Sequence, residues 1–583
     1  MEKLKIFKYL DDIVDAYQEP TERVTGLLRK PKDIIRTVEF YSNSQYLSGN
    51  TDSLGREKPF YNVGNYRVTV AKVATDLDVK DIRFEPDDLK FATRAMLINK
   101  KLYELLKEIN FSKTLNDAGL TRPKYGGVIL KKTERKSKLN IEVIDWTNID
   151  FDPSDVLGGT FIETFYLYPS ELSKQRGVWK NIDDVLEAHE KATKGKPEKI
   201  EIKEVTGEFP KSFDPKNDNE EADDEYARMC FYIACVGKKK YLLYVEEEKE
   251  MRYKYLPWEQ IGNSLGRGVW EDGFESQIWQ NDAMISMKNA MDISGKVIIA
   301  TDSQKISGNA ITGVDNGHIF QIEQGRSVNS LNLAPSSMPQ FERAIELWNA
   351  QYDKTASTFD ANTGEAPTAG TPYSQTALLN QVANSPFEFR REEYGIFLNE
   401  VLNDWIMPYL KKKIKKEGIL VADFDDEELD VIDQDIVDFT GVDYFKKALM
   451  QGIVPTEEEM QKVKDQQKSI LLKGGKKRQI PIPEGYLDIE GKLTANITGE
   501  LKNKQAILQS LDNIFKTIAS TYNPATGTYS ALEDPTLSKV FNYIIETAGI
   551  PISSVQLKPK PQQPVQPLPE QQPQQNVDTG RTK

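Results

Sequence analysis

Three features of the sequence have residue types and spacings that could support chemistry: an acidic run, a glycine-rich segment and the histidines. The acidic run extends from Asp423 to Asp438, and a two-metal nuclease needs carboxylates that converge on cations about 4 Å apart. The glycine-rich segment, Gly262–Gly268, precedes a predicted helix, where backbone N–H groups can bind a phosphate. The histidines are His189 and His318. Each feature is therefore a candidate site that has to be weighed against a structural role.

The acidic run fits a solvated or intersubunit surface better than a metal site. Its spacing does not require the carboxylates to converge, and the glycine of a calcium-binding loop is missing. A metal-dependent nucleic-acid-processing enzyme that uses this run remains an open alternative. The acidic side chains of the run are Asp425, Asp426, Glu427, Glu428, Asp430, Asp433, Asp435 and Asp438.

The glycine-rich segment and the histidines do not predict catalysis. The segment lacks the Lys-Ser/Thr pair of a nucleotide-binding loop and the dinucleotide-binding spacing, so we interpret it as a turn into a helix. His189 lies on a polar predicted helix and is expected to be exposed. Two histidines cannot assemble a histidine-based acid–base pair or a zinc cluster. We therefore predict no catalytic residue, no cofactor and no metal, and a protein that is not an enzyme.

The composition narrows the class of protein further. A length of 583 residues exceeds a single-core domain, and 39% hydrophobic residues support packed cores. The formal net charge of −14 argues against a globally basic nucleic-acid binder, but it is compatible with a wall that lets a DNA duplex slide.

No apolar run approaches the ~20 residues that span a bilayer. The segment Met1–Phe7 lacks the apolar core of a signal peptide. Cys230 and Cys235 share a predicted strand at an odd offset, so they cannot pair, and we expect synthesis in a reducing cytoplasm.

Two basic groups also require an interpretation. Lys411 to Lys416 close a predicted helix, where cations complement the negative end of the helix dipole, and contact with DNA or another subunit is the alternative. The other group flanks Gly474-Gly475 in a predicted loop, and we expect it either to contact DNA or to be solvated. Its members are Lys473, Lys476, Lys477 and Arg478.

A helix–β–helix order dominates the middle of the chain. The first helix is predicted to begin after Gly266–Gly273 and to run to about Ile293. Short strands between turns predict a compact β insert from Lys296 to Leu333. A second helix is predicted from about Pro339. The apolar stripe of the first helix consists of Trp279, Ala283, Met287 and Met291, and that of the second consists of Phe341, Ile345, Trp348 and Tyr352. A separate polar face of the second helix carries Glu342, Glu346, Asn349 and Asp353.

A Gly/Thr/Pro-rich loop and a long helix follow this pair. The loop, Asp360–Pro372, has no apolar anchor and is expected to be exposed. The helix beyond it is interrupted at Pro386, where the missing N–H forces a kink or a break. Its distal half carries a strong apolar stripe of Tyr394, Phe397, Leu398, Val401, Leu402, Trp405 and Tyr409.

The rest of the chain predicts an α+β first half and a helical end. The stretch Tyr66–Val73 fits either a strand or a helix, whereas Asp87–Ile109 predicts a helix with Leu89, Met96, Tyr103 and Leu106 facing inward. A β-rich block extends from Lys124 to about Leu256. Further helices are predicted at Phe7–Tyr17, Pro31–Leu47, Ser170–Gln175, Ile182–Ala192, Asp443–Gln451, Thr456–Leu472, Glu500–Ser520 and Thr536–Ala548. From Pro551 onward, Pro and Gln dominate and predict disorder.

This order of parts resembles the portal (head–tail connector) proteins of tailed bacteriophages, with a crAss-like phage as one candidate source. Two segments carry the resemblance, "GRGVWEDGFESQIWQNDAM" and "TALLNQV…FEFRREEYGIFLNEVLNDWIMPYL", together with the β insert, the acidic helix and the Gly/Thr/Pro loop. The similarity extends from about Tyr61 to Ile550 and consists of element order and loose patterns, without a catalytic signature.

The resemblance implies a portal-like α+β fold and its division into parts. These are an N-terminal helical segment (1–60), an α+β wing (61–265), stem helix 1 (266–294), a clip (295–338), stem helix 2 (339–360), a tunnel loop (361–376), a kinked helix with wing return (377–440), a helical crown (441–550) and a Pro/Gln-rich tail (551–583). It also implies roles for residues. The tunnel loop would use Asn362, Thr363, Gly364, Thr368, Gly370 and Thr371, and the clip would dock partners through Lys305, His318 and Arg326. From its own position after Asn316-Gly317, His318 favours a structural role over contact with a partner.

The implied function is a ring at one capsid vertex through which the genome is packaged and ejected. The expected partners are further copies of the chain (twelve by family resemblance), the major capsid protein, the terminase large subunit, head–tail adaptor or neck proteins, and double-stranded DNA without sequence specificity. The face of Glu342, Glu346, Asn349 and Asp353 would line the channel or a subunit interface, with an ordinary solvated helix face as the alternative. The expected location is the virion, after assembly in the host cytoplasm. An adaptor or minor capsid protein is the structural alternative.

Overall fold

The computed structural model describes most of the chain up to residue 495. The described residues are 5–18, 29–52, 55–135, 138–194, 196, 198–215, 225–294, 298–301, 324–325, 328–331, 338–358, 373–417, 419–420, 426–472, 479–480, 482–483, 485–495, 516, 522–523 and 528–529. They have a mixed α+β fold, as predicted. The chain divides into unit 1 (residues 1–83, 102–410 and 493–499) and unit 2 (residues 84–101, 411–492 and 500–583).

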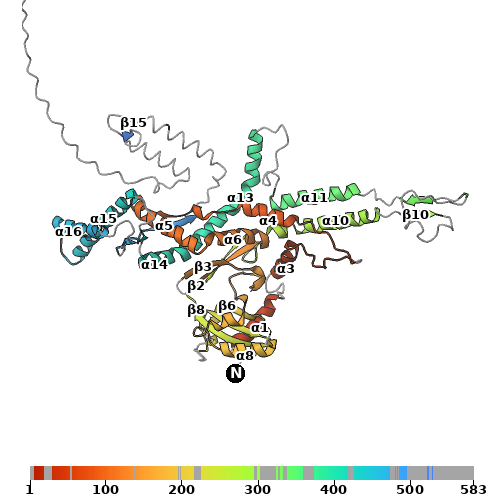
Figure 1. Ribbon diagram of the computed structural model, residues 1–583, viewed down its shortest axis with the longest axis horizontal. Coiled ribbons are helices and arrows are strands. Elements are labelled where there is room, and N and C mark those ends of the chain that lie inside the picture. The colour runs from red at the N-terminus through yellow and green to blue at the C-terminus, as the bar shows by residue number, and fades with distance from the viewer. Residues whose placement is uncertain are drawn as a thin grey trace, which may run out of the picture. The chain divides into compact units, whose positions relative to one another are not determined.

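A five-stranded antiparallel sheet forms one part of unit 1. Its strand order is β4-β5-β6-β7-β8, and its strands are β4 (Ile149–Asp150), β5 (Phe161–Leu167), β6 (Ile200–Pro210), β7 (Tyr226–Val236) and β8 (Lys239–Glu247). Alternating side chains give each face its own core. Val205 on β6 packs with helix α1 (Lys5–Gln18), whereas Ile202 packs with α7 (Pro169–Ser173) and α8 (Ile182–Thr193). Figure 1 shows α1 and α8 beside this sheet.

A buried group of charges joins this sheet to a second, three-stranded one. The second sheet has the order β3-β2-β9, from β2 (Gly127–Arg135), β3 (Lys138–Val143) and β9 (Tyr253–Pro257). The Lys131 ammonium on β2 lies 2.6 Å from the Glu163 carboxylate and 2.7 Å from that of Glu204, which belong to β5 and β6. The Tyr253 hydroxyl donates to both carboxylates at 3.0 Å. Each buried charge thus has an opposite charge and a hydrogen bond, as burial requires.

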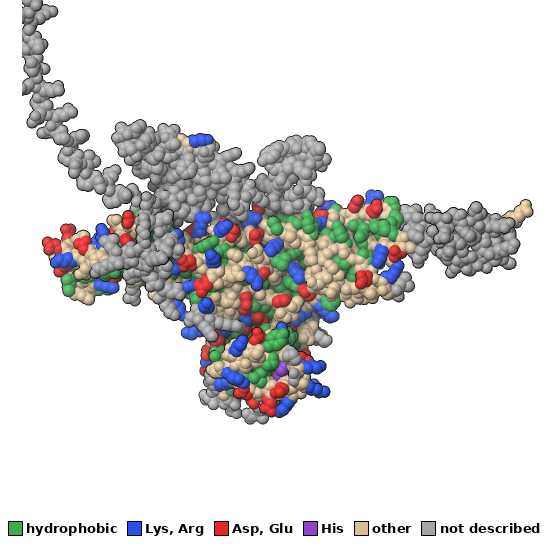
Figure 2. All heavy atoms as spheres, in the orientation of Figure 1, with side chains coloured by type: hydrophobic (Ala, Val, Ile, Leu, Met, Phe, Trp, Pro, Cys, Tyr) green, Lys and Arg blue, Asp and Glu red, His purple; other side chains and the backbone are tan. Residues whose placement is uncertain are grey.

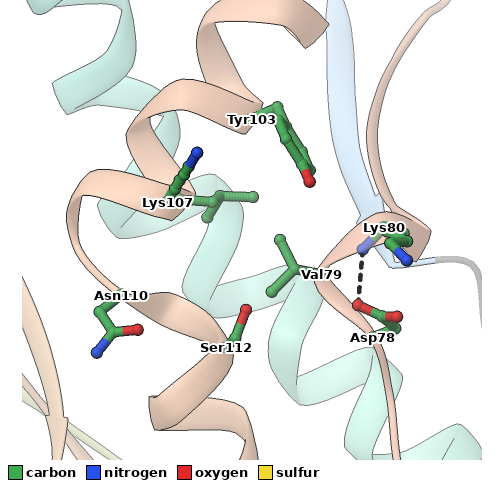
Figure 3. Close-up of a pocket in the computed structure, with 8 residues that line it drawn as sticks. Asp78, Val79, Lys80, Tyr103, Lys107, Asn110 and Ser112 are labelled. Carbon is green, nitrogen blue, oxygen red and sulfur yellow. Dashed lines mark hydrogen bonds between the residues drawn. The ribbon is translucent and has the colours of Figure 1, made fainter.

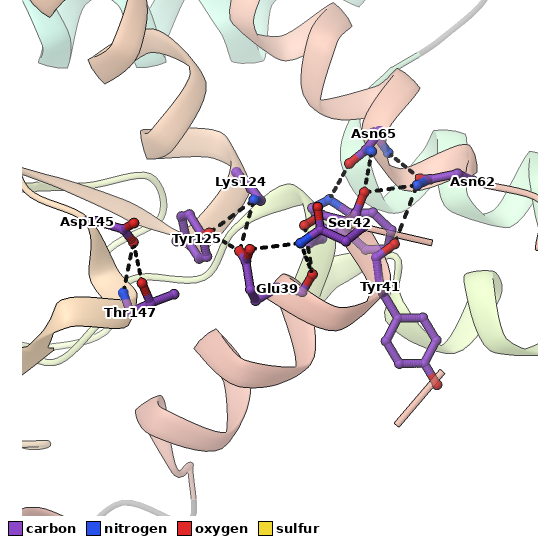
Figure 4. Close-up of polar contacts among 11 residues, drawn as sticks. Glu39, Tyr41, Ser42, Asn62, Asn65, Lys124, Tyr125, Asp145 and Thr147 are labelled. Atoms are coloured by element: carbon purple, nitrogen blue, oxygen red, sulfur yellow. Dashed lines mark hydrogen bonds and ion pairs between the residues drawn. The ribbon is translucent and has the colours of Figure 1, made fainter. Parts of the chain in front are cut away.

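Four helices pack around Trp270 beside the three-stranded sheet. They are α3 (Pro31–Ser42), α4 (Val63–Ala74), α6 (Phe111–Tyr125) and the short α9 (Val269–Asp272). The stretch Tyr66–Val73, whose sequence fits either a strand or a helix, is therefore helical and belongs to α4. The helix α6 was not predicted. Their polar surfaces are also tied together (Figure 4): Glu39 of α3 accepts hydrogen bonds from Tyr125 and from Lys124 at 3.2 Å, and Asn65 of α4 donates to the Ser42 carbonyl at 2.7 Å.

Glycines permit the closest backbone contacts of this core. A Cβ at Gly268 would lie 2.6 Å from the Gly126 nitrogen, and one at Gly266 would overlap the Gly126 carbonyl oxygen. A Cβ at Gly273 would overlap the Tyr352 ring. Since a side chain fits at none of these positions, the glycine-rich segment serves packing at the start of the long helix pair.

The helix pair consists of α10 (Phe274–Ser294) and α11 (Met338–Ala356). Strands β10 (Ile298–Thr301) and β11 (Val328–Leu331) pair antiparallel after α10 and before α11. The long helix α13 (Tyr373–Val401) continues through Pro386 and bends, so the predicted interruption is not a break (Figure 1). It leads into a π-helical turn (Leu402–Ile406) and then α14 (Met407–Glu417).

Unit 2 is built around the helix pair α15 (Asp426–Met450) and α16 (Glu457–Leu472). The predicted helix Asp443–Gln451 is therefore only the end of a longer helix that includes most of the acidic run. Arg94 of α5 (Ala92–Glu108) lies 4.8 Å from the ring centre of Phe439 and 4.6 Å from that of Tyr486. The remaining described elements are η1 (Val79–Asp81), β1 (Ile82–Pro86), η2 (Leu89–Phe91), η3 (Trp146–Asn148), η4 (Lys211–Phe213), β12 (Ile419–Leu420), β13 (Gln479–Ile480), β14 (Gly491–Ala495), β15 (Tyr522–Asn523) and β16 (Thr528–Tyr529).

Two predicted side-chain positions are wrong. Tyr103 was expected to face inward from its helix, but 54% of its surface is exposed, whereas Leu106 is buried. His189 was expected to be exposed, but it is buried at the end of α8 against the sheet, and its Nε2 lies 3.0 Å from the Glu198 carbonyl oxygen. The Glu198 carbonyl, which lies next to the His189 ring only in the folded chain, gives the buried ring a hydrogen-bond partner. The polar residues around His189 in the sequence therefore did not reveal its burial.

We predict that Gly273→Ala destabilises unit 1 by about 1–3 kcal/mol, because the added methyl group overpacks the site against the buried Tyr352 ring. Chemical denaturation followed by circular dichroism measures this change. Gly119→Ala is the matched control: it lies inside α6, where a Cβ meets ordinary contact distance at 3.8 Å, so it should be neutral or stabilising by about 0.5–1 kcal/mol. Equal stability of the two variants would contradict the packing role of Gly273.

Candidate functional site

The α10–α11 hairpin holds the predicted stem face, and two tryptophans join its helices. The rings of Trp279 on α10 and Trp348 on α11 stack with centroids 5.9 Å apart and an interplanar angle of 7°. Half of the Trp279 surface is nevertheless exposed, as are Met291 and Leu347. Figure 2 shows hydrophobic side chains on the visible surface of this hairpin. The predicted stripe of α10 is therefore not a core face.

The buried face of α10 is polar instead. Ser276, Gln277, Gln280 and Asn281 are all buried. The Gln277 side-chain oxygen accepts hydrogen bonds from the Val63 and Gly64 nitrogens, each at 3.0 Å, and the Asn281 oxygen accepts one from the Tyr61 nitrogen at 2.9 Å. These bonds satisfy N–H groups at and before the start of α4, which have no partner inside that helix. The polar spacing was visible in the sequence, but its partner was not.

The predicted face on α11 divides into an exposed half and an anchored half. Glu342 and Glu346 are exposed. Asn349 and Asp353 bind Arg67 of α4, whose Nη2 lies 2.8 Å from the Asn349 side-chain oxygen and 2.6 Å from the Asp353 carboxylate. Arg67 is only 5% exposed, so this pair is an internal contact that holds α11 on α4. Of the four predicted residues on this face, Glu342 and Glu346 are therefore the exposed ones.

Burial and neighbouring charges perturb Asp272 where α9 meets α10. Burial, followed by repulsion from Glu259 and Glu271, raises the pKa of Asp272 from 3.8 to about 7, although Arg267 and Arg390 oppose the shift. The Arg267 guanidinium lies 3.6 Å from the Asp272 carboxylate. The charge of this carboxyl group therefore changes near neutral pH, next to Arg267 of the glycine-rich segment.

The acidic run does not form a metal site in the part of it that the structure describes. Within the described residues, no three His, Cys, Asp or Glu side chains gather to hold a metal ion. Asp435 is buried and already paired, with Arg94 at 3.1 Å and the Tyr486 hydroxyl at 2.7 Å. Asp430 and Asp438 are exposed on α15. These contacts give Asp435 a packing role in unit 2.

One cleft in unit 1 has a partly polar lining, to which none of the predicted site residues contributes. It has a volume of about 220 Å³ and lies between the turn at Asp78–Lys80, the end of α5 and the start of α6 (Figure 3). Asp78 accepts a hydrogen bond from the Lys80 nitrogen at 3.2 Å, and Lys107 and Ser112 line the opposite side. This lining brings together no nucleophile and base within hydrogen-bond reach, so the cleft supports no catalytic assignment.

Three predicted groups lie outside the described residues. They are the tunnel-loop residues Asn362, Thr363, Gly364, Thr368, Gly370 and Thr371, the clip residues Lys305, His318 and Arg326, and the basic group Lys473, Lys476, Lys477 and Arg478. The roles assigned to them remain predictions.

No protein-family model matches this chain, and a search of curated proteins finds no match either. Among the helices that the structure describes, none combines the length and the apolar character needed to cross a bilayer.

We predict that Arg67→Met lowers the free energy of unfolding by about 3 kcal/mol, because the change removes the cation that pairs with the partly buried Asp353 carboxylate. Amide hydrogen exchange should show the loss in α11 before it appears in α1. Glu346→Gln is the control on the exposed half of the same face, and it should stay within about 0.5 kcal/mol. If the two substitutions cost the same, Arg67 does not anchor α11.

We predict that Asp272→Asn stabilises the protein more at pH 8 than at pH 5. The raised pKa means that the folded state prefers the protonated carboxyl group, so the stability this group contributes is complete below about pH 4 and is lost as the pH rises through about 7. Thermal unfolding across this range measures the effect. Asp184→Asn, at an exposed carboxylate, should not shift the melting temperature differently at the two pH values. A pH-independent effect of Asp272→Asn would contradict the assignment.

Proposed function

We propose that this protein is a phage portal protein, a structural ring at one capsid vertex that channels the genome during packaging and ejection. The observation that carries the proposal is the α10–α11 hairpin with the β10–β11 pair beyond its helices, followed by the long bent helix α13. The portal resemblance of the sequence has the same order of stem helix, clip, stem helix and kinked helix. We also propose that the fold divides into the wing, stem, clip and crown of a portal protein.

The exposed parts of the hairpin suit a subunit of such a ring. A cyclic ring needs a different surface on each side of the subunit, since its interfaces are heterologous. The hairpin offers an exposed aromatic and aliphatic surface at Trp279, Met291 and Leu347, and separate carboxylates at Glu342 and Glu346. Carboxylates repel a passing DNA backbone, so they would favour sliding over binding. In this proposal the protein carries out no covalent chemistry itself.

The proposed partners follow from the same assignment. Copies of the chain would form the ring, twelve by family resemblance, and the clip with Lys305, His318 and Arg326 would dock the terminase large subunit and later the adaptor or neck proteins. The outer α+β part would meet the major capsid protein. The loop from Asn362 to Thr376 would face double-stranded DNA in the channel, and the basic group Lys473, Lys476, Lys477 and Arg478 would touch DNA near the crown. The protein would be a virion component, assembled in the bacterial cytoplasm.

Negative-stain imaging of the purified protein tests the proposal, and we expect rings with a central opening. An adaptor or minor capsid protein that is not a connector would give compact single-copy particles instead. Trp348→Asp should abolish or strongly reduce ring formation, because it places a charge against the Trp279 ring between the stem helices. Val178→Asp, at an exposed apolar residue of the outer sheet region, is the matched control and should assemble normally. Wild-type particles without an opening would refute the portal assignment.

A further inference from the structure

The turn between α15 and α16 exposes an unusual number of apolar side chains. Met450 is 88% exposed, Val454 75%, Ile453 57% and Leu449 46%. Single exposed apolar residues are normal on protein surfaces, but four within six positions form a patch. We name these four residues the apolar tip.

The backbone under the apolar tip is fixed. The Gly452 nitrogen donates to the Leu449 carbonyl at 2.9 Å and the Ile453 nitrogen donates to the Ala448 carbonyl at 3.0 Å, with Gly452 in the left-handed region. These bonds close the end of α15 as a Schellman motif. At the start of α16, Thr456 and Glu459 bond each other's backbone nitrogens at 3.0 and 3.4 Å. A patch held in place at both ends loses little entropy when it binds a partner.

Charges next to the apolar tip indicate the kind of partner. Glu457, Glu458 and Glu459 follow it directly on the first turn of α16, and all three are exposed. The complementary partner is therefore a segment with an apolar stripe and a cationic flank.

One segment of the chain has this composition. Between Leu501 and Ile518 the sequence carries three lysines and one aspartate. Its apolar residues recur at helical spacing, and a helix is predicted at Glu500–Ser520. The stripe consists of Ile507, Leu511, Ile514 and Ile518, and the lysines are Lys502, Lys504 and Lys516.

We propose that residues 501–518 dock as an amphipathic helix on the apolar tip of the same chain. Apolar stripe would meet apolar tip, and the lysines would face Glu457–Glu459. The same chain is the favoured source because the segment follows the described residues 491–495 by only a few positions in the sequence, and a tethered segment has a high effective concentration. This inference goes beyond the portal proposal and does not depend on ring formation.

Amide hydrogen exchange of the full-length protein tests the proposal, with Met450→Glu/Val454→Glu as the disrupting variant. We expect protection of residues 501–518 in the wild type, independent of protein concentration, and a drop of about tenfold or more in the variant. Ile470→Glu is the matched control on the same helix pair, since it is exposed but lies outside the tip, and it should preserve the protection. Amides of α15 near Asp435 report whether unit 2 is still folded; if they lose protection, Met450→Gln/Val454→Thr replaces the first variant.

Three results would overturn the proposal: no protection of residues 501–518 in the wild type, equal protection in the tip variant, or protection that appears only as protein concentration rises. The last result would assign the tip to a neighbouring copy. Ring counting on micrographs is independent of all three, so failure here and failure of the portal assignment can be told apart.

Discussion

Backbone-to-backbone contact at glycines is the constraint on which unit 1 depends. Gly126 follows α6, Gly266 and Gly268 precede α9, and no Cβ fits between these segments. At the next turn, the absence of a side chain at Gly273 lets the buried Tyr352 ring of α11 reach the α9–α10 junction, where its hydroxyl donates to the Val269 carbonyl at 3.2 Å. The direction in which the hairpin leaves the core is therefore set by steric exclusion, which tolerates little variation.

Polar and charged contacts then hold the α10–α11 hairpin in the position that the glycines permit. Gln277 and Asn281 satisfy the chain at the start of α4, and Arg67 of α4 reaches back to Asn349 and Asp353 of α11. A hydrogen-bonded buried group is specific because any other arrangement leaves it unsatisfied at a cost of about 1–3 kcal/mol. The hairpin base is thus specified by directional contacts, whereas Trp279 and Leu347 on its outer surface are exposed.

The contrast between the anchored base and the exposed surface of the hairpin is relevant to the proposed portal ring. A subunit that carries a stem through a ring needs a base that does not slip and a surface that neighbours can cover. The described hairpin has a base held by directional contacts and an exposed apolar surface, and its exposed Glu342 and Glu346 add negative charge. In unit 2, the pairing of Asp435 with Arg94 and Tyr486 makes part of the acidic run a packing element, which weakens its use as a metal site.

The sequence alone determined the α+β class, the β-rich block that contains the five-stranded sheet, and the helix pair with its β insert, because periodic burial and turn residues are local signals. It could not decide between strand and helix at Tyr66–Val73, since both periods fit eight residues. It also predicted, wrongly, that Tyr103 is buried and that His189 is exposed. Only the tertiary structure showed that the polar side of α10 is the buried one and that half of the acidic face of α11 binds Arg67. The physical reason is that a polar residue is buried when a partner from a distant part of the chain satisfies it, and periodicity carries no record of that partner.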